Sequence, residues 1–356
     1  MEDTQIFNFT VKSQVHNYNV NFIDDFRNHL NNNLIEGDYI IIDNNILNLY
    51  KDDLEVLEDF NYVGIDSNEN QKSYEGLIPI IDYLINTGFK KNHRLIAIGG
   101  GITQDVTSFI ASTLYRGVRW VFYPTTLLAQ GDSCIGSKTS INFREFKNQM
   151  GGFYPPNSVF IYLNFTKSLK QSEIKSGLGE MLHYFIVSSE EDFLFYKKYY
   201  MDAFENTESL LKIISKSLMI KKRYIEKDEF DKNIRQVFNY GHSFGHAIES
   251  LTNYKIPHGV AVSFGMDIAN FVSYKMDLID NKTRKDILEV TSNIWNGYDL
   301  KEIKLDKLIY ALKKDKKNVG NKLGLILNNG YGKIFKKFIH PNEKFKNILT
   351  EYFKSI

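Results

Sequence analysis

The sequence predicts an α/β protein, with a Rossmann-like N-terminal domain built on a doubly wound, mainly parallel sheet and a mostly α-helical C-terminal domain. Two observations lead to this prediction. Up to about residue 164, short apolar runs alternate with stretches of helical periodicity. Beyond that point the strand signal fades and helical periodicity dominates. We therefore expect a nucleotide-type domain over residues 1–164 and a helical domain over residues 165–356.

Four apolar runs in the first domain end at Gly, Pro, Asp or Asn and predict strands that are buried on both faces. They are residues 38–45, 94–101, 119–126 and 158–163. Helical periodicity marks 74–89 and 103–117 between them, and later 172–188, 208–229 and 258–276. Since strands alternate with helices, the strands should be parallel. The charged run 312–322 is expected to be a solvated loop.

Composition restricts the possible partners and the compartment. The 356 residues include 44 Lys and Arg and 43 Asp and Glu, so the formal net charge is +1. A balanced charge does not indicate binding to nucleic acid or to an anionic membrane. No apolar run reaches the roughly 20 residues that span a bilayer. The polar N-terminus lacks the apolar segment of a signal peptide. A single cysteine, Cys134, excludes an internal disulfide framework and a thiolate zinc cluster. We expect a cytoplasmic protein without a membrane or nucleic-acid partner.

Two features of the first domain could hold a nucleotide. Gly99–Gly101 follow an apolar run and precede a helix, so backbone N–H groups could approach a phosphate. The spacing differs from G-x-G-x-x-G, and a simple tight turn is the alternative. Asp43 ends the run at 38–43, where an acid could accept ribose hydroxyls. Its alternative role is a helix N-cap.

The turn-rich stretch 130–148 interleaves small residues with charged and amide side chains. Asp132, Lys138, Lys147 and Asn148 lie in it. Small residues beside lysines suit the close approach of an anionic ligand, whereas a solvated polar loop is the alternative.

The second domain contains one acid and three imidazoles in helical contexts. These residues are Glu180, His242, His246 and His258, an inventory that suits a zinc-like ion with an open position. His242 and His246 are four residues apart, so they share one face of a helix. Either both bind one metal, or one binds metal while the other contacts substrate. Buried polar side chains without a ligand are the alternative.

Taken together, the chain resembles the 3-dehydroquinate synthases and, more broadly, the sugar phosphate cyclases. The matching stretches occur in order along nearly the whole length. They are “DNN” (43–45), “ENQKS” (69–73), “GGGITQD” (99–105), “YRG” (115–117), “PTTLLAQGDS” (124–133), “KTSIN” with “KN” (138–142, 147–148), “GLGE” (177–180), “KDE” (227–229), “IRQVFNYGHSFGHAIE” (234–249), “HG” (258–259) and “DKK” (315–317).

The resemblance implies ligands and the residues that hold them. Glu180, His242 and His258 would bind one divalent metal, zinc or cobalt, and His246 would face the substrate phosphate. Residues 1–164 would bind NAD, and residues 165–356 the metal and the substrate. The implied NAD contacts are Asp43, Asn45, Glu69, Lys72, Gly100, Gly101, Asp105, Thr125, Thr126, Lys147 and Ser168. The implied substrate contacts are Asp132, Lys138, Asn148, Lys221, Arg235, Asn239, His246 and a lysine of the “DKK” run, Lys316 or Lys317. Arg116 would come from the partner subunit of a homodimer.

The implied activity is that of a lyase acting on a small-molecule sugar phosphate. NAD and the metal would assist elimination of phosphate from a carboxylated seven-carbon sugar phosphate, and an intramolecular aldol step would close the carbocycle. Lys221 and Arg235 match the pair that binds the carboxylate in the family. One alternative is a specialised cyclase of secondary-metabolite or surface-sugar biosynthesis, and another is a metal-dependent polyol dehydrogenase.

The chain departs from the family pattern in five places, and His183, Ser137 and Val260 leave the exact sugar phosphate open. The family usually has Lys at His183, a second Gly at Ser137 and Glu at Val260. It also has Glu at Asp231 and “HPLG” where this chain has “FREF” (143–146). His183 follows Glu180 by one helical turn and should point into the cavity of the metal ligand, so it is a further candidate for contact with the substrate.

Overall fold

The computed structural model describes residues 7–144, 146–315 and 317–355. The chain forms two compact units: residues up to Leu169 with Lys221–Phe230, and Lys170–Ile220 with the residues from Asp231 onward. The sequence suggested one boundary after residue 164, without a return of 221–230 to the first unit. Glu229 links the segment 221–230 to the first unit. Its carboxylate accepts hydrogen bonds from Ser137 Oγ at 2.6 Å and from Gln14 N at 2.6 Å.

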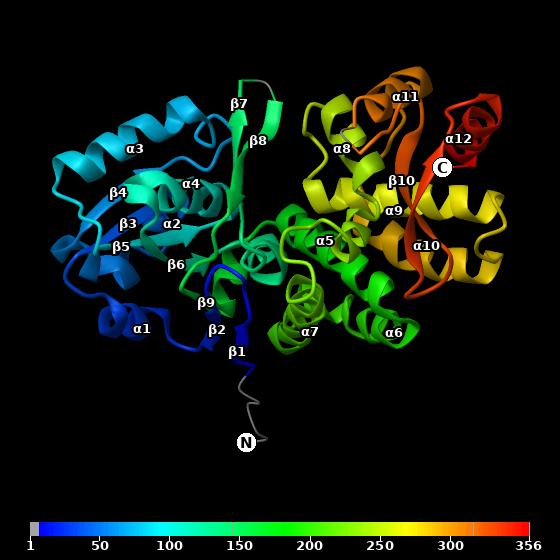
Figure 1. Ribbon diagram of the computed structural model, residues 1–356. Helices are drawn as coiled ribbons and strands as arrows, with labels where there is room; N and C mark the ends of the chain where they lie inside the picture. Colours follow the sequence, from blue (N-terminus) through cyan, green and yellow to red (C-terminus); the bar gives the residue numbers. More distant parts are fainter. Residues whose placement is uncertain (1–6, 145, 316, 356) are drawn as a thin grey trace. The chain divides into compact units, whose positions relative to one another are not determined.

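The first unit is built on a seven-stranded sheet within the described residues, with the order β1-β2-β9-β6-β5-β3-β4 (Figure 1). β1 is antiparallel to β2, and the other neighbouring strands are parallel. The strands are β1 (Phe9–Val11), β2 (Tyr18–Ile23), β3 (Asp38–Asp43), β4 (Asn61–Ile65), β5 (Arg94–Gly99), β6 (Arg119–Pro124) and β9 (Ser158–Tyr162). The predicted doubly wound parallel sheet is confirmed, and the four predicted runs are β3, β5, β6 and β9.

Helices flank this sheet and cover its apolar strands. They are α1 (Phe26–Asn33), α2 (Asn44–Leu49), α3 (Tyr74–Asn86) and α4 (Gly101–Thr113), with the 3-10 helices η1 (Lys51–Asp59), η2 (Leu114–Arg116) and η4 (Leu163–Ser168). Ile40 and Ile42 of β3 and Ile96 and Ile98 of β5 form one buried cluster with Phe26 of α1. Burial of both faces explains why these strands are continuous apolar runs in the sequence.

Several strands were not predicted from the sequence. β2 alternates apolar and polar residues in “YNVNFI”, and β4 contributes mostly exposed or half-buried residues. The antiparallel hairpin β7 (Lys138–Phe143) and β8 (Phe146–Phe153) lies outside the main sheet, and much of β8 is exposed. Without a continuous apolar face, such segments resemble the loops around them.

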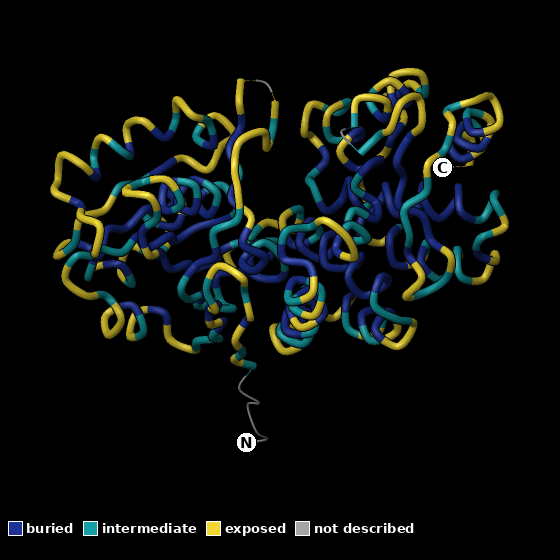
Figure 2. The backbone as a smooth tube through the Cα atoms, viewed as in Figure 1, coloured by how far each residue is buried: buried dark blue, intermediate teal, exposed yellow. Residues whose placement is uncertain are grey.

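The second unit is mostly helical, as predicted, and its described residues include one antiparallel hairpin. Its helices are α5 (Gln171–Ser188), α6 (Glu190–Tyr199), α7 (Thr207–Ile225, whose last residues belong to the first unit), α8 (His242–Leu251), α9 (His258–Lys275), α10 (Asn281–Trp295), α11 (Leu305–Lys313) and α12 (Glu343–Ser355). The hairpin is β10 (Leu323–Asn328) and β11 (Ile334–Ile339). Every residue of α9 from Gly259 to Ser273 is buried, so this helix forms the centre of the unit (Figure 2). Among the described residues, no helix is both long enough and apolar enough for a bilayer crossing.

Glycines allow α5 and α8 to pack against α9 at backbone contact. A Cβ added to Gly259 would lie 1.8 Å from Ser176 O, and one added to Gly179 would lie 2.2 Å from Gly259 O. On the α8 side, a Cβ at Gly265 would lie 2.0 Å from Gly241 O. Any side chain at these positions would force the helices apart. This packing therefore brings Glu180 of α5, His242 of α8 and His258 of α9 together.

We expect Gly259→Ala to destabilise the second unit by about 2–3 kcal/mol or more, because its methyl group would overlap backbone atoms that cannot move independently. The measurement is urea unfolding followed by circular dichroism. Gly152→Ala is the matched control, since an added Cβ there meets no atom of the described residues within 4 Å. Equal midpoints for the two variants would contradict the proposed helix contact.

Candidate functional site

Three side chains from three helices of the second unit meet at one point. Glu180 belongs to α5, while His242 and His258 are the first residues of α8 and α9. His242 Nε2 lies 3.2 Å from Glu180 Oε1, and His258 Nε2 lies 3.2 Å from Glu180 Oε2. One ligand atom from each residue lies within 4.8 Å of the others. The packing of these helices thus gathers one carboxylate and two imidazoles.

The outer nitrogens of both imidazoles have acceptors of their own. His242 Nδ1 lies 3.2 Å from Tyr240 O, and His258 Nδ1 lies 3.0 Å from Glu249 Oε2. A proton on each Nδ1 leaves the Nε2 lone pair directed at Glu180, which is the arrangement of metal-binding histidines. Although burial opposes ionisation, the positive charges of His242 and His258 hold the pKa of Glu180 well below its ordinary value. A divalent ion of the zinc type would take the place of the Nε2 protons and be held by one carboxylate and two imidazoles.

His246 lies one turn after His242 on α8, as the four-residue spacing predicts. Its ring centroid is 5.4 Å from that of His242 and 5.7 Å from that of His258. His246, Glu249 and His258 form a second group whose possible ligand atoms lie within 4.8 Å of one another. Geometry alone therefore leaves the role of His246 open, as the sequence did.

His183 lies beside the candidate metal ligands and is almost fully covered, with 1% of its side chain exposed. Its Nδ1 is 3.8 Å from Glu180 Oε1, and its ring packs against Tyr184 and edge-on to His242. His183 and Glu180 lie on the same face of α5, because a step of three residues along a helix returns to that face. That both line one cavity stays a prediction.

The other candidates in the second unit lie on a 3-10 helix and a loop. Arg235 and Asn239 belong to η6 (Ile234–Asn239), where Arg235 is buried and Asn239 Nδ2 donates to Gln236 O at 3.1 Å. Lys317 Nζ is 3.1 Å from Asp315 Oδ2. Lys316, the alternative lysine of this run, lies outside the described residues. The charged run begins in α11 and continues as a turn-rich segment.

In the first unit, several NAD candidates lie at the carboxyl ends of neighbouring parallel strands. Asp43 ends β3, Gly100 and Gly101 follow β5, and Thr125 and Thr126 follow β6. β3 pairs with both β4 and β5, so the sheet changes its winding direction between β3 and β5. Ligands of doubly wound sheets bind at such a switch point. A Cβ at Gly101 would meet no described atom within 4 Å, so the backbone is accessible there.

Asp43 also serves as the helix cap that was its alternative interpretation. Its Oδ1 accepts a hydrogen bond from Asn45 N at 2.8 Å, and its Oδ2 accepts one from Ser67 Oγ at 2.5 Å. The same carboxylate thus begins α2 at the edge of the switch point. Asn45 itself is exposed on the first turn of α2.

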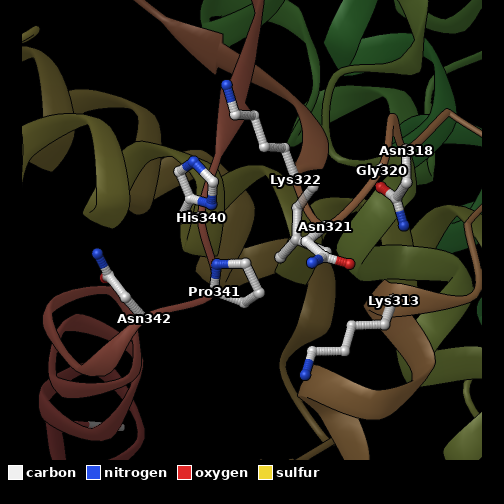
Figure 3. Close-up of a pocket in the computed structure, with 9 residues that line it drawn as sticks. Lys313, Asn318, Gly320, Asn321, Lys322, His340, Pro341 and Asn342 are labelled. Atoms are coloured by element: carbon white, nitrogen blue, oxygen red, sulfur yellow. The ribbon is translucent and has the colours of Figure 1, made fainter.

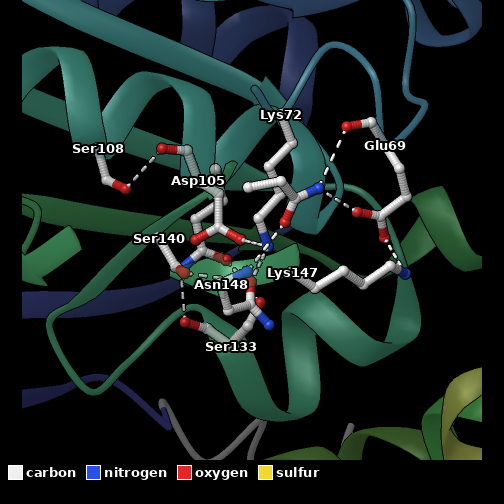
Figure 4. Close-up of polar contacts among 10 residues, drawn as sticks. Glu69, Lys72, Asp105, Ser108, Ser133, Ser140, Lys147 and Asn148 are labelled. Carbon is white, nitrogen blue, oxygen red and sulfur yellow. Dashed lines mark hydrogen bonds and ion pairs between the residues drawn. The ribbon is translucent and has the colours of Figure 1, made fainter. Parts of the chain in front are cut away.

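A polar network joins four further NAD candidates to Asn148 (Figure 4). Lys72 Nζ contacts Asp105 Oδ2 at 2.5 Å and donates to Asn148 Oδ1 at 2.7 Å. Lys147 Nζ contacts Glu69 Oε1 at 2.7 Å. Although burial opposes ionisation, hydrogen bonds from Lys147 and Asn142 hold the pKa of Glu69 below its ordinary value. The network fastens the β7–β8 hairpin to the 69–72 loop and to α4.

Two substrate candidates of the first unit form an ion pair. Lys221 Nζ contacts Asp132 Oδ1 at 2.7 Å and Asp132 O at 2.6 Å, with Lys221 buried and Asp132 in the π-helical turn η3 (Ala129–Ser133). Burial raises the pKa of the neighbouring Cys134 thiol to about 12, so this cysteine is no thiolate nucleophile at neutral pH.

Three further candidates belong to the first unit. Lys138 is exposed at the start of β7, and Arg116 is exposed in η2 with a φ of 62°. Ser168 ends η4 and donates from Oγ to Phe165 O at 2.9 Å.

A cavity of about 530 Å³ lies elsewhere in the second unit, beside the end of α11 and the β10–β11 hairpin (Figure 3). Its lining residues are Lys313, Asn318, Gly320, Asn321, Lys322, Leu323, His340, Pro341 and Asn342. None of them is a candidate from the sequence, and both lysines and His340 are exposed.

Two residues that contact the candidate metal ligands were not identified from the sequence. The Glu249 carboxylate lies within hydrogen-bond distance of His258 Nδ1, and the Tyr240 carbonyl lies within hydrogen-bond distance of His242 Nδ1. A signal for Glu249 was present: it follows His242 by seven residues, which is two helical turns on the same face. The contact from the Tyr240 carbonyl could not be predicted from the sequence, because every residue has a backbone carbonyl.

Comparisons with known proteins identify the family of the chain. Residues 62–176 match the model of the N-terminal domain of 3-dehydroquinate synthase, and residues 177–318 match that of its C-terminal domain. The chain is 37% identical to the 3-dehydroquinate synthase of Dictyoglomus thermophilum over 306 residues, which cover 83% of each chain. It is 32% identical to that of Streptococcus equi subsp. equi over 360 residues, which cover 97% of each.

The chain belongs to the 3-dehydroquinate synthase family. Solved structures with low sequence identity share its fold. A 2-deoxy-scyllo-inosose synthase complexed with carbaglucose-6-phosphate, NAD+ and Co2+ has a TM-score of 0.83 at 20% identity, covering 98% of this chain and 99% of that one. A 2-epi-5-epi-valiolone synthase from Streptomyces hygroscopicus with NAD+ and Zn2+ bound has a TM-score of 0.83 at 22% identity, covering 95% and 97%. An iron-containing alcohol dehydrogenase is more distant, with a TM-score of 0.61 at 16% identity, covering 95% and 98%.

One departure from the family pattern has a clear local explanation. Ser137 stands where the family usually has glycine, and its φ of 64° is a conformation that favours glycine. Its hydroxyl compensates by donating to Glu229 Oε1 at 2.6 Å, on a carboxylate that also accepts from Ser13 Oγ at 2.7 Å.

We expect Ser137→Ala to lower the free energy of unfolding by about 2 kcal/mol, since it loses a hydrogen bond to a carboxylate and keeps the strained backbone. Ser137→Gly relieves that strain and should be about 1 kcal/mol more stable than Ser137→Ala. Urea unfolding of both variants beside the unaltered chain measures the difference. An alanine variant as stable as the glycine variant would contradict the compensation.

Proposed function

We propose that the chain is an NAD- and metal-dependent sugar phosphate cyclase of the 3-dehydroquinate synthase type, acting as a lyase on a carboxylated seven-carbon sugar phosphate. The observation that best supports this proposal is the convergence of Glu180, His242 and His258, each imidazole oriented by an acceptor of its own. Relatives 32–37% identical to the chain carry the name 3-dehydroquinate synthase.

Glu180, His242 and His258 would hold zinc or cobalt, and the switch point between β3 and β5 would receive NAD. When bound, the ion supplies a Lewis acid for a ring oxygen, and NAD supplies a hydride acceptor that is restored in each turnover. Gly100 and Gly101 at the start of α4 offer backbone N–H groups to the pyrophosphate. Asp43 would accept the ribose hydroxyls. Asn45, Glu69, Lys72, Asp105, Thr125, Thr126, Lys147 and Ser168 would complete the NAD contacts.

The charged side chains would hold the substrate in one pose. Lys221 and Arg235 would bind the carboxylate, and both are buried, which strengthens their interaction with an anion. His246, with Lys317 or its neighbour Lys316, would bind the phosphate. Asp132, Lys138, Asn148 and Asn239 would contact the remaining oxygens. The exposed Arg116 would act in the partner subunit of a cytoplasmic homodimer. Holding one polyanion in a fixed pose lowers the entropic part of the barrier.

The reaction itself tests the proposal. With a carboxylated seven-carbon sugar phosphate and one equivalent of NAD, we expect release of inorganic phosphate over many turnovers, without net NADH. Phosphate assay, product mass and nicotinamide absorbance measure this. Accumulation of NADH in step with substrate use would instead indicate a polyol dehydrogenase, whose architecture is similar.

His183 distinguishes a 3-dehydroquinate synthase from a specialised cyclase with another substrate. A lysine is charged and long, whereas the buried imidazole is short and planar. If the substrate differs from the 3-dehydroquinate precursor at one ring hydroxyl, His183→Lys should raise the rate on that precursor by roughly 10-fold or more. An unaltered chain with full activity, together with no effect of His183→Lys, would exclude the specialised cyclase.

The metal ligands are tested by alanine substitution. We expect His242→Ala or His258→Ala to remove the ion and the activity together, because either change leaves two of three protein ligands. His246→Ala should keep the ion and lose turnover. Elemental analysis of dialysed protein measures the ion content. A metal-free His246→Ala protein would identify His246 as a ligand and contradict the proposed set.

A further inference from the structure

Glu249 is placed to control one of the proposed metal ligands. It lies on α8 two turns after His242, and 12% of its side chain is exposed. Its Oε2 lies 3.0 Å from Nδ1 of His258, the first residue of α9. The other nitrogen of the same ring, Nε2, lies 3.2 Å from Glu180 Oε2. His258 is therefore held between two carboxylates.

The chemistry of imidazole decides what each nitrogen does. A neutral ring has one N–H and one lone pair. If Nδ1 keeps its proton and donates a hydrogen bond to Glu249, the lone pair on Nε2 faces Glu180, as metal binding requires. The carboxylate also fixes the rotation of the ring and increases the basicity of Nε2. His242 is held in the same way, but its acceptor is the uncharged Tyr240 carbonyl.

A second interpretation of the same cluster is a separate metal site. His246, Glu249 and His258 each offer a possible ligand atom, and these atoms lie within 4.8 Å of one another. However, His258 would then need a lone pair on both nitrogens, which requires removal of both ring protons. The hydrogen-bonded arrangement needs no such deprotonation, so the geometry favours a partner over a ligand.

We propose that Glu249 is the positioning residue of His258, setting its tautomer and orientation so that Nε2 binds the metal. The inference rests on the proposed function, since it assumes that Glu180, His242 and His258 hold one ion. It assigns to Glu249 a role in metal affinity without direct contact with the ion.

The test compares Glu249→Ala and Glu249→Gln with the unaltered chain. Zn2+ and Co2+ dissociation constants are measured by competition with a chromophoric chelator, together with the ion content and the Co2+ absorption spectrum. We expect Glu249→Ala to weaken binding 10- to 100-fold and to change the Co2+ spectrum, with one ion per chain throughout. Glu249→Gln keeps an oxygen acceptor for Nδ1–H, so it should recover part of the affinity.

Asp192→Asn is the matched control, because Asp192 is an ion-paired carboxylate of the same unit, with its Oδ1 2.8 Å from Lys216 Nζ. It should leave metal affinity unchanged even if stability falls. Equal affinity of Glu249→Ala and the unaltered chain would overturn the proposal. Two ions in the unaltered chain and one in Glu249→Gln would make Glu249 a ligand instead. A His242→Ala protein that keeps its ion at full affinity would count against the metal set itself, and so against both proposals.

Discussion

Backbone contact between helices is the constraint on which the candidate metal centre depends. Glu180, His242 and His258 lie in three separate helices. His242 is the first residue of α8, and His258 is the first residue of α9. Carboxylate and imidazole side chains are short, so their atoms can meet only if the helix axes come unusually close. Gly179 and Gly259 allow this between α5 and α9. The Ser176 hydroxyl accepts a hydrogen bond from Gly259 N at 3.0 Å and fixes the register of the contact.

Three of the candidate binding side chains are held by partners within the chain. Lys72 is held by Asp105 and Asn148, Lys221 by Asp132, and His258 by Glu249. The entropy cost of fixing each side chain is therefore incurred during folding and not during ligand binding. This favours tight and well-oriented binding of the ligand.

The sequence predicted those parts of the molecule whose pattern is local. β3, β5, β6 and β9 were found because strands covered on both faces are continuous apolar runs. β2 and β4 were missed because half-exposed strands mix polar and apolar residues. The return of 221–230 to the first unit depends on Glu229 and its donors Ser13 and Ser137, which are far apart in the sequence. Likewise the set Glu180, His242 and His258 could be assembled from motifs, but the contact from Glu249 to His258 required the crossing of α8 and α9.

The departures from the family pattern differ in what they can change. Val260 is fully buried in α9, so an apolar residue suits the packing where a glutamate would need a partner. Ser137 satisfies its hydroxyl on Glu229 and leaves the loop conformation intact. Both substitutions are therefore explained by local structure. His183 alone is adjacent to a proposed metal ligand, with its ring packed against Tyr184 and His242. A lysine there would place a fixed charge on a long stem beside Glu180, whereas the imidazole is shorter and planar. Of these three positions, His183 is consequently the one through which this chain could differ from its relatives in substrate.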